Sequence, residues 1–307
     1  MVEEPIYSFA ALRNRLEIQG ILVAQTALRI GAGRSNDVIG NDLPVLRDSL
    51  GAPFVPGASL KGAFRARVEA LIRAVQPDQA LDLPQIEAHM RDAIMPLPER
   101  DATIQNLTRA RKIAEADREL SKRIWAKSTL IDLTFGAPWV AGRIFFKDAL
   151  VDRSLWFDQF EIRNGVALNR DTETVEQGLL YDYEVVPAGI RFGFELVLEN
   201  AAPWQLGMVL LALRPWQNGD VQIGGFRSRG LGHVQLIEAV TKYSAIEGGD
   251  PAARADAVLG MLGYGKSSAK ELPLEQSDER LQPWFEAFKQ ALIDPQAAIE
   301  QGAAFNA

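Results

Sequence analysis

The order in which strand-like and helical apolar periodicities follow one another limits the folds open to this chain. In IRFGFELVLE, for example, every second residue from Ile190 to Leu198 is apolar, and Arg191, Glu195 and Glu199 lie on the other face, which is typical of a half-buried antiparallel strand. The predicted elements, in chain order, are a strand ending at Ile30, a helix at 60–75, strands at 142–151 and 190–199, a helix at 204–216, and a strand, turn and strand at 221–239.

This order is βαββαβ once the intervening segments are removed, and it predicts an α+β, ferredoxin-like (RRM-like) fold. The strands do not alternate regularly with helices, so a doubly wound parallel sheet is disfavoured. Besides this main domain at 1–240, we expect an inserted helical region at about 77–130, irregular over 77–104 and a basic helix over 105–130, a hairpin at about 160–186 and a C-terminal helical extension at 241–307.

Composition narrows the chemistry that the chain can perform. It has no cysteine, which excludes thiol nucleophiles and cysteine-based zinc sites, and only two histidines, His89 and His233. Acid–base or metal chemistry must therefore use Asp, Glu, Lys, Arg or Tyr. The sequence contains neither a long apolar run nor a signal-peptide pattern at its start, so we expect a cytoplasmic protein that does not bind a membrane.

Charge is unevenly distributed along the chain. The net charge is −7, yet the segment from Arg109 to Lys127 holds seven basic and three acidic residues. Local basic patches on an acidic chain are compatible with a binding site for a polyanion, and equally with solvated helix faces.

A long segment without regular period, residues 31–58, separates the first strand from the first helix. It is rich in Gly, Asp and Pro, and irregular segments of this length within a compact domain are usually functional. It opens with GAGRSN, which lacks the third glycine of a dinucleotide-binding fingerprint because Asn36 stands in its place. We therefore do not expect a Rossmann-type nucleotide site.

The helix that follows begins in GASLKGAF, residues 57–64. Ser59 is a suitable N-cap, and the free N–H groups of a helix start attract phosphate. Lys61 and Arg65 are four residues apart and so share a face, while Gly57 and Gly62 let another backbone approach.

A second glycine-rich stretch, GGFRSRGLGHV at 224–234, is predicted to turn between two strands. Its glycines favour a β-turn that needs positive φ angles. Alternatively, its backbone forms a phosphate cradle beside Arg227 and Arg229. Together, two separate turns that combine glycine with basic residues favour an extended polyanion over a single nucleotide.

Five stretches taken together resemble the CRISPR-associated RAMP superfamily, and most of all the backbone subunits of type III effector complexes. They are LRIGAGRS, VIGNDLPVLRDSLGAPFVPGASLKGAFR, LTFGAPWVAGRIFFKDA, YDYEVVPAG and GGFRSRGLGHV, within residues 12–240. The resemblance implies a ferredoxin-like palm that stacks with other copies along a guide RNA. It also implies a hairpin, the thumb, that displaces one base pair at intervals, and cleavage of the target RNA beside each displaced base.

The resemblance assigns roles to individual residues. Asp42 matches the aspartate required for cleavage with Mg²⁺ or Mn²⁺, with Asp37 and Asp48 as neighbours that assist or replace it; alternatively, Asp42 only closes an Asx turn. No zinc is expected. Apolar candidates for the thumb side chains that wedge between guide and target are Val166, Leu168, Val175 and Leu179. The expected RNA-binding residues are Gly57, Ser59, Lys61, Gly62, Arg65, Arg163, Arg170, Gly224, Gly225, Arg227, Ser228, Arg229 and Gly230.

These assignments predict a subunit that binds guide RNA and cuts complementary target RNA, with other CRISPR effector subunits, including further copies of backbone subunits, as partners. One alternative is a scaffold of the same kind that binds RNA without cutting it. Another is a metabolic enzyme that holds a small phosphorylated ligand in a discrete pocket.

Overall fold

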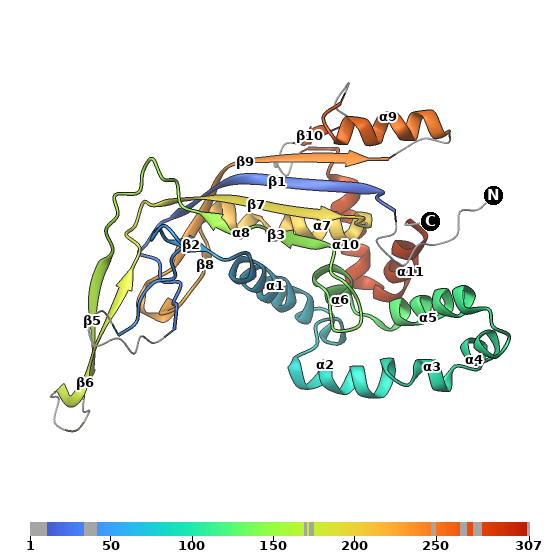
Figure 1. The fold of residues 1–307 in the computed structure, drawn as a ribbon, viewed down its shortest axis with the longest axis horizontal. Coiled ribbons are helices and arrows are strands. Elements are labelled where there is room, and N and C mark those ends of the chain that lie inside the picture. The colour runs from blue at the N-terminus through green and yellow to red at the C-terminus, as the bar shows by residue number, and fades with distance from the viewer. Residues whose placement is uncertain are drawn as a thin grey trace.

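The computed structural model describes residues 11–33, 42–168, 171, 175–246, 250–264, 269–272 and 278–305. It is a mixed α+β structure in which an antiparallel sheet runs through the molecule and helices cover one of its faces (Figure 1). The strand order is β10-β9-β1-β7-β3, and β8 pairs with β9. These strands are β1 (Asn14–Ala24), β3 (Ile144–Phe146), β7 (Arg191–Glu199), β8 (Val221–Gln222), β9 (His233–Ala245) and β10 (Lys270–Leu272).

The centre of the sheet follows directly from the alternating sequence pattern. Leu16 pairs with Leu198 and Ile18 with Leu196, and all four side chains are fully buried. The opposite face of the same strands carries ion pairs such as Arg15–Glu199. Because successive strand residues point to opposite faces, one face of the sheet is available to pack against helices and the other is polar.

Helices α1 (Gly57–Arg73), α7 (Pro203–Ala212) and α8 (Arg214–Asn218) cover the apolar face. The contact centres on Phe64 of α1, whose ring lies 6.0 Å from that of Trp216 and 5.5 Å from that of Phe146. Phe64 and Trp216 are both fully buried. The helical spacing of the α1 sequence therefore positions this helix by burying an aromatic core residue.

Two predicted boundaries are wrong. The first strand ends at Ala24 rather than Ile30, because the chain then exchanges backbone partners: the N–H of Leu28 donates to Val186 O at 2.9 Å, away from the main sheet. Helix α1 begins at Gly57 with Pro56 as its N-cap, and Ser59 lies inside its first turn, where its N–H donates to Pro56 O.

The region predicted to be irregular, 77–104, is helical. Asp82 caps a helix through a capping box with Gln85, and the prolines there occupy helix starts, where a missing N–H costs no hydrogen bond. The predicted basic helix is two helices, broken at Arg111, which has a left-handed φ of 59°. The elements of this helical arm are η1 (Pro77–Gln79), α2 (Leu83–His89), η2 (Met90–Ile94), α3 (Leu97–Arg100), α4 (Ala102–Arg109), α5 (Ile113–Lys127) and α6 (Leu130–Phe135).

A two-stranded hairpin projects from one end of the molecule (Figure 1). Its strands are β5 (Glu161–Leu168) and β6 (Val175–Val185), and it occupies the segment where the sequence predicts a long hairpin. The predicted strand at 142–151 is divided into β3 and β4 (Ala149–Leu150), and β4 pairs with β2 (Phe54–Val55) instead of the main sheet. This small sheet connects the base of the hairpin with the start of α1.

The C-terminal segments pack on the main core. Helix α10 (Gln282–Ile293) lies where the sequence predicts a short helix with an apolar stripe. It crosses α7 so closely that a Cβ on Gly207 would lie 2.0 Å from Trp284 O. The Trp125 indole N–H donates to Ile299 O at 3.0 Å, which ties α5 to α11 (Pro295–Phe305). Helix α9 (Pro251–Met261) lies beyond β10. Among the helices of the described residues, none is both long and apolar enough to cross a bilayer.

Candidate nucleic-acid interface

The start of α1 is shaped by packing of the protein on itself. Gly57 donates its N–H to Asp148 Oδ1 at 2.7 Å, and a Cβ at this position would lie 2.4 Å from Phe146 O. Gly57 is thus required for the approach of the β3–β4 turn. By contrast, a Cβ on Gly62 would meet no atom within 4 Å, so the surface beside Gly62 is open.

The two predicted cations of α1 differ in their availability. Arg65 donates to Glu69 Oε1 at 2.6 Å and to Gly136 O at 3.1 Å, so it already has an ionic and a neutral partner. Lys61 makes no ion pair with the described residues. Burial, and next the charge of Arg65, lower the pKa of Lys61, so its ammonium group lies in a position that an anion would stabilise.

The second glycine-rich stretch is a tight turn held against residues 27–29. Gly225 donates its N–H to Arg29 O at 2.8 Å, and Gly232 donates to Ala27 O at 2.9 Å. Gly224 has a φ of +78°, and a Cβ there would lie 2.2 Å from Arg29 O. We call residues 224–232 the GR turn. Its glycines fix the position of the turn, and the 3₁₀ segment Arg227–Arg229 is exposed at its tip.

The arginines of the GR turn also differ. Arg229 donates from Nη1 to the Tyr181 hydroxyl at 2.5 Å and lies over the Phe226 ring at 4.9 Å. The hydrogen bond to Tyr181 raises the pKa of Arg229. Arg227 is exposed, and its guanidinium contacts no acidic side chain among the described residues. Arg227 is therefore the unpaired cation of the turn, while Arg229 is oriented by the hairpin.

Asp42 lies against the base of the hairpin. Its Oδ2 accepts the N–H of Asp182 at 3.2 Å, and the next residue, Leu43, pairs in parallel with Tyr183. Asp48 is occupied elsewhere, because it accepts the N–H groups of Leu50 and Ala52 and forms an ion pair with Arg153 at 2.6 Å. Asp48 therefore closes a turn and is not available to assist Asp42, and Asp37 lies outside the described residues.

Strand β6 connects these parts of the site. Glu184 accepts two hydrogen bonds from Arg47 Nη2, at 2.8 and 2.7 Å, and one from Val45 N–H at 3.0 Å. The ring of Tyr183, its neighbour, lies 4.7 Å from that of Phe226 of the GR turn, tilted by 56°. The loop that carries Asp42 and the GR turn therefore meet on one strand, at the end of the molecule toward which the start of α1 points (Figure 1).

The hairpin carries the remaining predicted residues. Arg163 pairs with Glu161 at 3.1 Å in an exposed ion pair, and Val166 is 49% exposed. Gly165 lies beneath the Tyr181 ring, which a Cβ would overlap. Arg170 lies outside the described residues, as do the side chains of Leu168, Val175 and Leu179.

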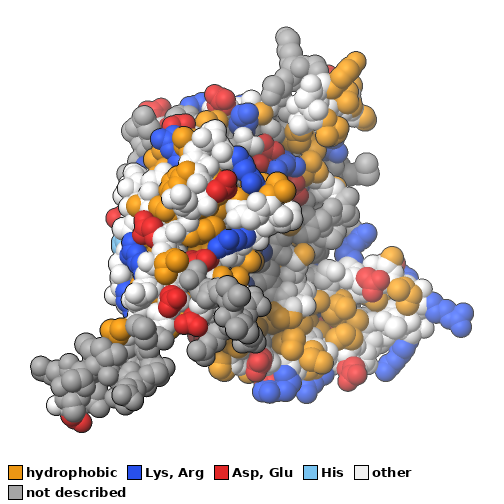
Figure 2. All heavy atoms as spheres, turned by 60° about the vertical axis from the view of Figure 1, so that its left-hand side comes forward, with side chains coloured by type: hydrophobic (Ala, Val, Ile, Leu, Met, Phe, Trp, Pro, Cys, Tyr) orange, Lys and Arg blue, Asp and Glu red, His pale blue; other side chains and the backbone are white. Residues whose placement is uncertain are grey.

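The surface around this end has no single sign of charge. In Figure 2, where this end comes forward, Lys and Arg side chains lie among acidic and apolar ones on the visible face. A polyanion would consequently meet individual cations here, because the N–H groups of Gly57, Ser59 and Gly225 are already hydrogen-bonded within the protein.

The acidic side chains at this end decide which kind of metal site is possible. Among the described residues, no three His, Asp or Glu side chains form a metal-binding group. Mg²⁺, however, is commonly held by one or two carboxylates together with phosphates of the substrate. Asp42, whose Oδ1 has no hydrogen-bond partner among the described residues, fits that kind of site.

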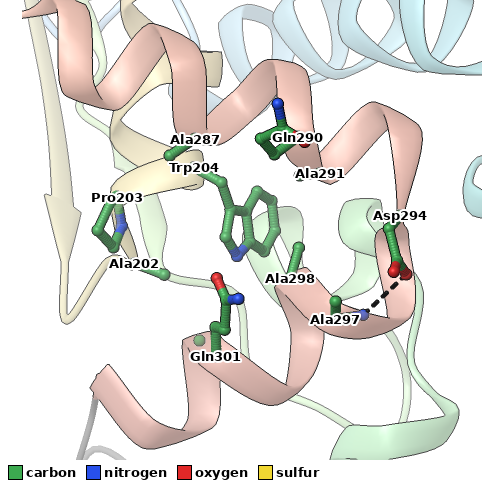
Figure 3. A pocket seen from close by; sticks show the side chains of 11 residues that line it. Ala202, Pro203, Trp204, Ala287, Gln290, Ala291, Asp294, Ala297, Ala298 and Gln301 are labelled. Atoms are coloured by element: carbon green, nitrogen blue, oxygen red, sulfur yellow. Dashed lines mark hydrogen bonds between the residues drawn. The ribbon is translucent and has the colours of Figure 1, made fainter.

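A discrete pocket lies elsewhere, between α7, α10 and α11 (Figure 3). Its volume is about 440 Å³, and none of its lining residues is Lys or Arg. It is walled mainly by small apolar side chains around Trp204. This pocket does not suit a phosphorylated ligand, so it gives no support to a metabolic enzyme of that kind.

Comparison with known proteins agrees with this architecture. A family model of the RAMP superfamily matches residues 21–235, and the chain belongs to that superfamily. Two similar proteins are each named CRISPR system Cms endoribonuclease Csm3. The one from Methanothermobacter thermautotrophicus is 22% identical over 237 residues, which are 75% of this chain and 86% of that protein. The one from Methanocaldococcus jannaschii is 39% identical over 59 residues, which span 19% of this chain and 24% of that protein.

Sequence reasoning missed several residues of the interface. Tyr181 and Tyr183 alternate in YDYE and thus share a face, a signal that was available. Arg29 stands between Leu28 and Ile30, where the alternation predicts a polar, solvated position, so the sequence pattern offers no sign that this residue is buried. The Arg47–Glu184 pair joins residues 137 positions apart, and no local pattern reveals such a contact.

Proposed function

We propose that this chain is a guide-RNA-binding backbone subunit of a type III CRISPR effector complex, and that it cleaves complementary target RNA. The observation that carries the proposal is the meeting of the Asp42 loop, the GR turn and the hairpin base on β6. Membership of the RAMP superfamily and similarity to two proteins named as CRISPR endoribonucleases support it.

The fold suits this role. The sheet order β9-β1-β7-β3, with α1 and α7 on one face, is compatible with a ferredoxin-like palm, and the β5–β6 hairpin is the candidate thumb. Lys61 and Arg227 are the best-placed residues to bind guide phosphates, because neither is neutralised by a described acidic side chain. Such contacts position RNA, whereas pairing between guide and target reads its sequence. In this role the chain would contact neighbouring copies of backbone subunits and other effector subunits, and it would act in the cytoplasm.

The proposed cleavage is an internal transfer in the target RNA. The 2′-oxygen of a ribose attacks its own 3′-phosphorus, the bond to the 5′-oxygen of the next nucleotide breaks, and a 2′,3′-cyclic phosphate and a 5′-hydroxyl result. Asp42 accepts the proton of the 2′-hydroxyl, and water protonates the departing oxygen. The Asp182 N–H fixes the carboxylate in orientation. Bound Mg²⁺ or Mn²⁺, held by Asp42 and phosphate oxygens, would neutralise charge on the phosphate.

The hydrogen bond from Asp182 to Asp42 also favours a second candidate function, a scaffold in which Asp42 only attaches its loop to the hairpin. Asp42→Asn separates the two, because the amide oxygen still accepts the Asp182 N–H while the negative charge is lost. In the assembled complex with guide, complementary RNA and Mg²⁺, we expect Asp42→Asn to bind target normally and to lose cleavage by a factor of at least about 10².

Asp48→Asn is the matched control, since it removes a carboxylate from the same loop and keeps the acceptor that closes the turn. It should cut as well as the unmodified complex. Cleavage that survives in Asp42→Asn would favour the scaffold. Purified protein without co-purifying RNA, judged from its absorbance at 260 and 280 nm, would count against both candidates.

A further inference from the structure

Within the described part of the chain, Arg29 is a buried cation whose side chain has no hydrogen-bonding partner. Its side chain belongs to a residue that is 9% exposed, and its Nε is buried without a hydrogen bond. Among the described residues, its guanidinium forms no ion pair or hydrogen bond. Burial lowers the pKa of Arg29. A buried charge that lacks a partner destabilises a fold, so this arrangement needs an explanation other than stability.

Glu184 is the acidic residue whose charge acts on Arg29, but it does not neutralise the guanidinium. Glu184 affects its charge at a distance, but the carboxylate of Glu184 is held by two hydrogen bonds from Arg47 and one from the N–H of Val45. The aromatic ring of Phe226 lies 5.2 Å from the guanidinium carbon. The ring supports the cation from one side without satisfying its N–H donors.

Small residues leave space around the guanidinium. A Cβ on Gly31 would lie 2.9 Å from Arg29 Nη1, and one on Gly225 would lie 3.3 Å from the same atom. The backbone of Arg29 is fixed as well, because its carbonyl accepts the Gly225 N–H. The guanidinium is thus held between the segment that leads to Asp42 and the GR turn, with its terminal nitrogens unoccupied.

We propose that Arg29 binds a phosphate of the RNA strand that crosses the GR turn, through Nη1 and Nη2. The proposal rests on the proposed function and adds a binding residue to it. The planar guanidinium matches two phosphate oxygens at once, and the unpaired Arg227 lies in the same turn. Arg29 and Tyr183 both lie against the ring of Phe226, and Tyr183 pairs with Leu43, the residue after Asp42. The phosphate held by Arg29 therefore lies beside the cleavage loop, and Arg29 is a positioning residue.

The test compares three variants of the full chain: Arg29→Met, Arg29→Lys and the control Arg67→Met, which removes an exposed charge from α1. Binding of fluorescein-labelled single-stranded RNA is measured by anisotropy over a range of salt concentrations. Arg29→Met should weaken binding and reduce the log–log salt slope by about 0.7, the value for one phosphate contact on a single strand. Arg29→Lys should keep the slope and bind more weakly, and Arg67→Met should change neither.

Thermal melting without RNA gives a readout that separates binding from structure. If Arg29 serves RNA, Arg29→Met melts at the same temperature as the unmodified chain or higher, because an uncompensated buried charge is removed. An unchanged slope in Arg29→Met overturns the proposal. If Arg29→Met fails to fold while Arg29→Lys binds RNA with unchanged affinity, the role is structural and the proposal is also overturned.

The same measurements distinguish failure of this inference from failure of the proposed function. If Arg227→Met reduces the slope and Arg29→Met does not, only the assignment of Arg29 is wrong. If the unmodified chain shows no salt-dependent binding of RNA, the proposed function itself is rejected.

Discussion

The rigidity of the GR turn can be tested by adding one methyl group to Gly224. At this position φ is +78°, and the new Cβ would lie 2.2 Å from Arg29 O. The left-handed backbone costs about 1–2 kcal/mol for a residue with a Cβ. Relief of the overlap costs about 1–3 kcal/mol more, because the turn must move away from Arg29.

Movement of the turn also breaks the hydrogen bond from Gly225 N–H to Arg29 O, which is 2.8 Å long. Such a bond contributes about 0.5–1.5 kcal/mol to the free energy of unfolding. We therefore expect Gly224→Ala to lower the free energy of unfolding by about 2.5–6.5 kcal/mol, the sum of these three terms. Because Arg227 and Arg229 move with the turn, RNA affinity should fall as well.

Gly230→Ala is the matched control in the same turn. Its φ is +81°, yet a Cβ there would meet no atom within 4 Å, so it should lose only the backbone term of about 1–2 kcal/mol. Urea denaturation of the RNA-free chain measures both variants, and an unchanged m-value shows that the unfolded state is comparable. Equal losses for the two variants would refute the reasoning, since the contact with Arg29 would then contribute nothing.

Two further predictions concern buried or half-buried charges. Burial raises the pKa of Asp132, so the folded protein becomes more stable as the pH falls from the folded pKa of this carboxyl toward its unfolded pKa. Asp132→Asn keeps an acceptor for the Thr129 N–H. In thermal melts this variant should be at least as stable as the unmodified chain near neutral pH, and it should lose that part of the pH dependence. Lys61→Met should reduce the salt slope of RNA binding by about 0.7, whereas a slope equal to that of Arg67→Met would remove Lys61 from the interface.

Local patterns correctly predicted the elements whose buried face shows directly as a strand or helix periodicity. The alternation at 190–199 became β7, Arg191–Glu199, and the stripe at 283–293 became α10, Gln282–Ile293. The first strand was predicted too long because residues 25–31 keep an apolar alternation while pairing outside the main sheet, as Leu28 does with Val186. The helices in 77–104 were missed because prolines at helix starts resemble breakers when caps such as Asp82 are overlooked.

By itself, the sequence determined the α+β class, the absence of thiol chemistry and the membership of the RAMP superfamily, since periodicity, composition and motif order are properties of the linear chain. Only the tertiary structure decided which cations are free to bind. Arg65 is neutralised by Glu69 and Arg47 by Glu184, whereas Lys61, Arg227 and the buried Arg29 pair with no acidic side chain of the residues that the structure describes. Whether a charge is available depends on contacts between residues far apart in the chain, because burial and ion pairing are set by packing and not by neighbouring letters.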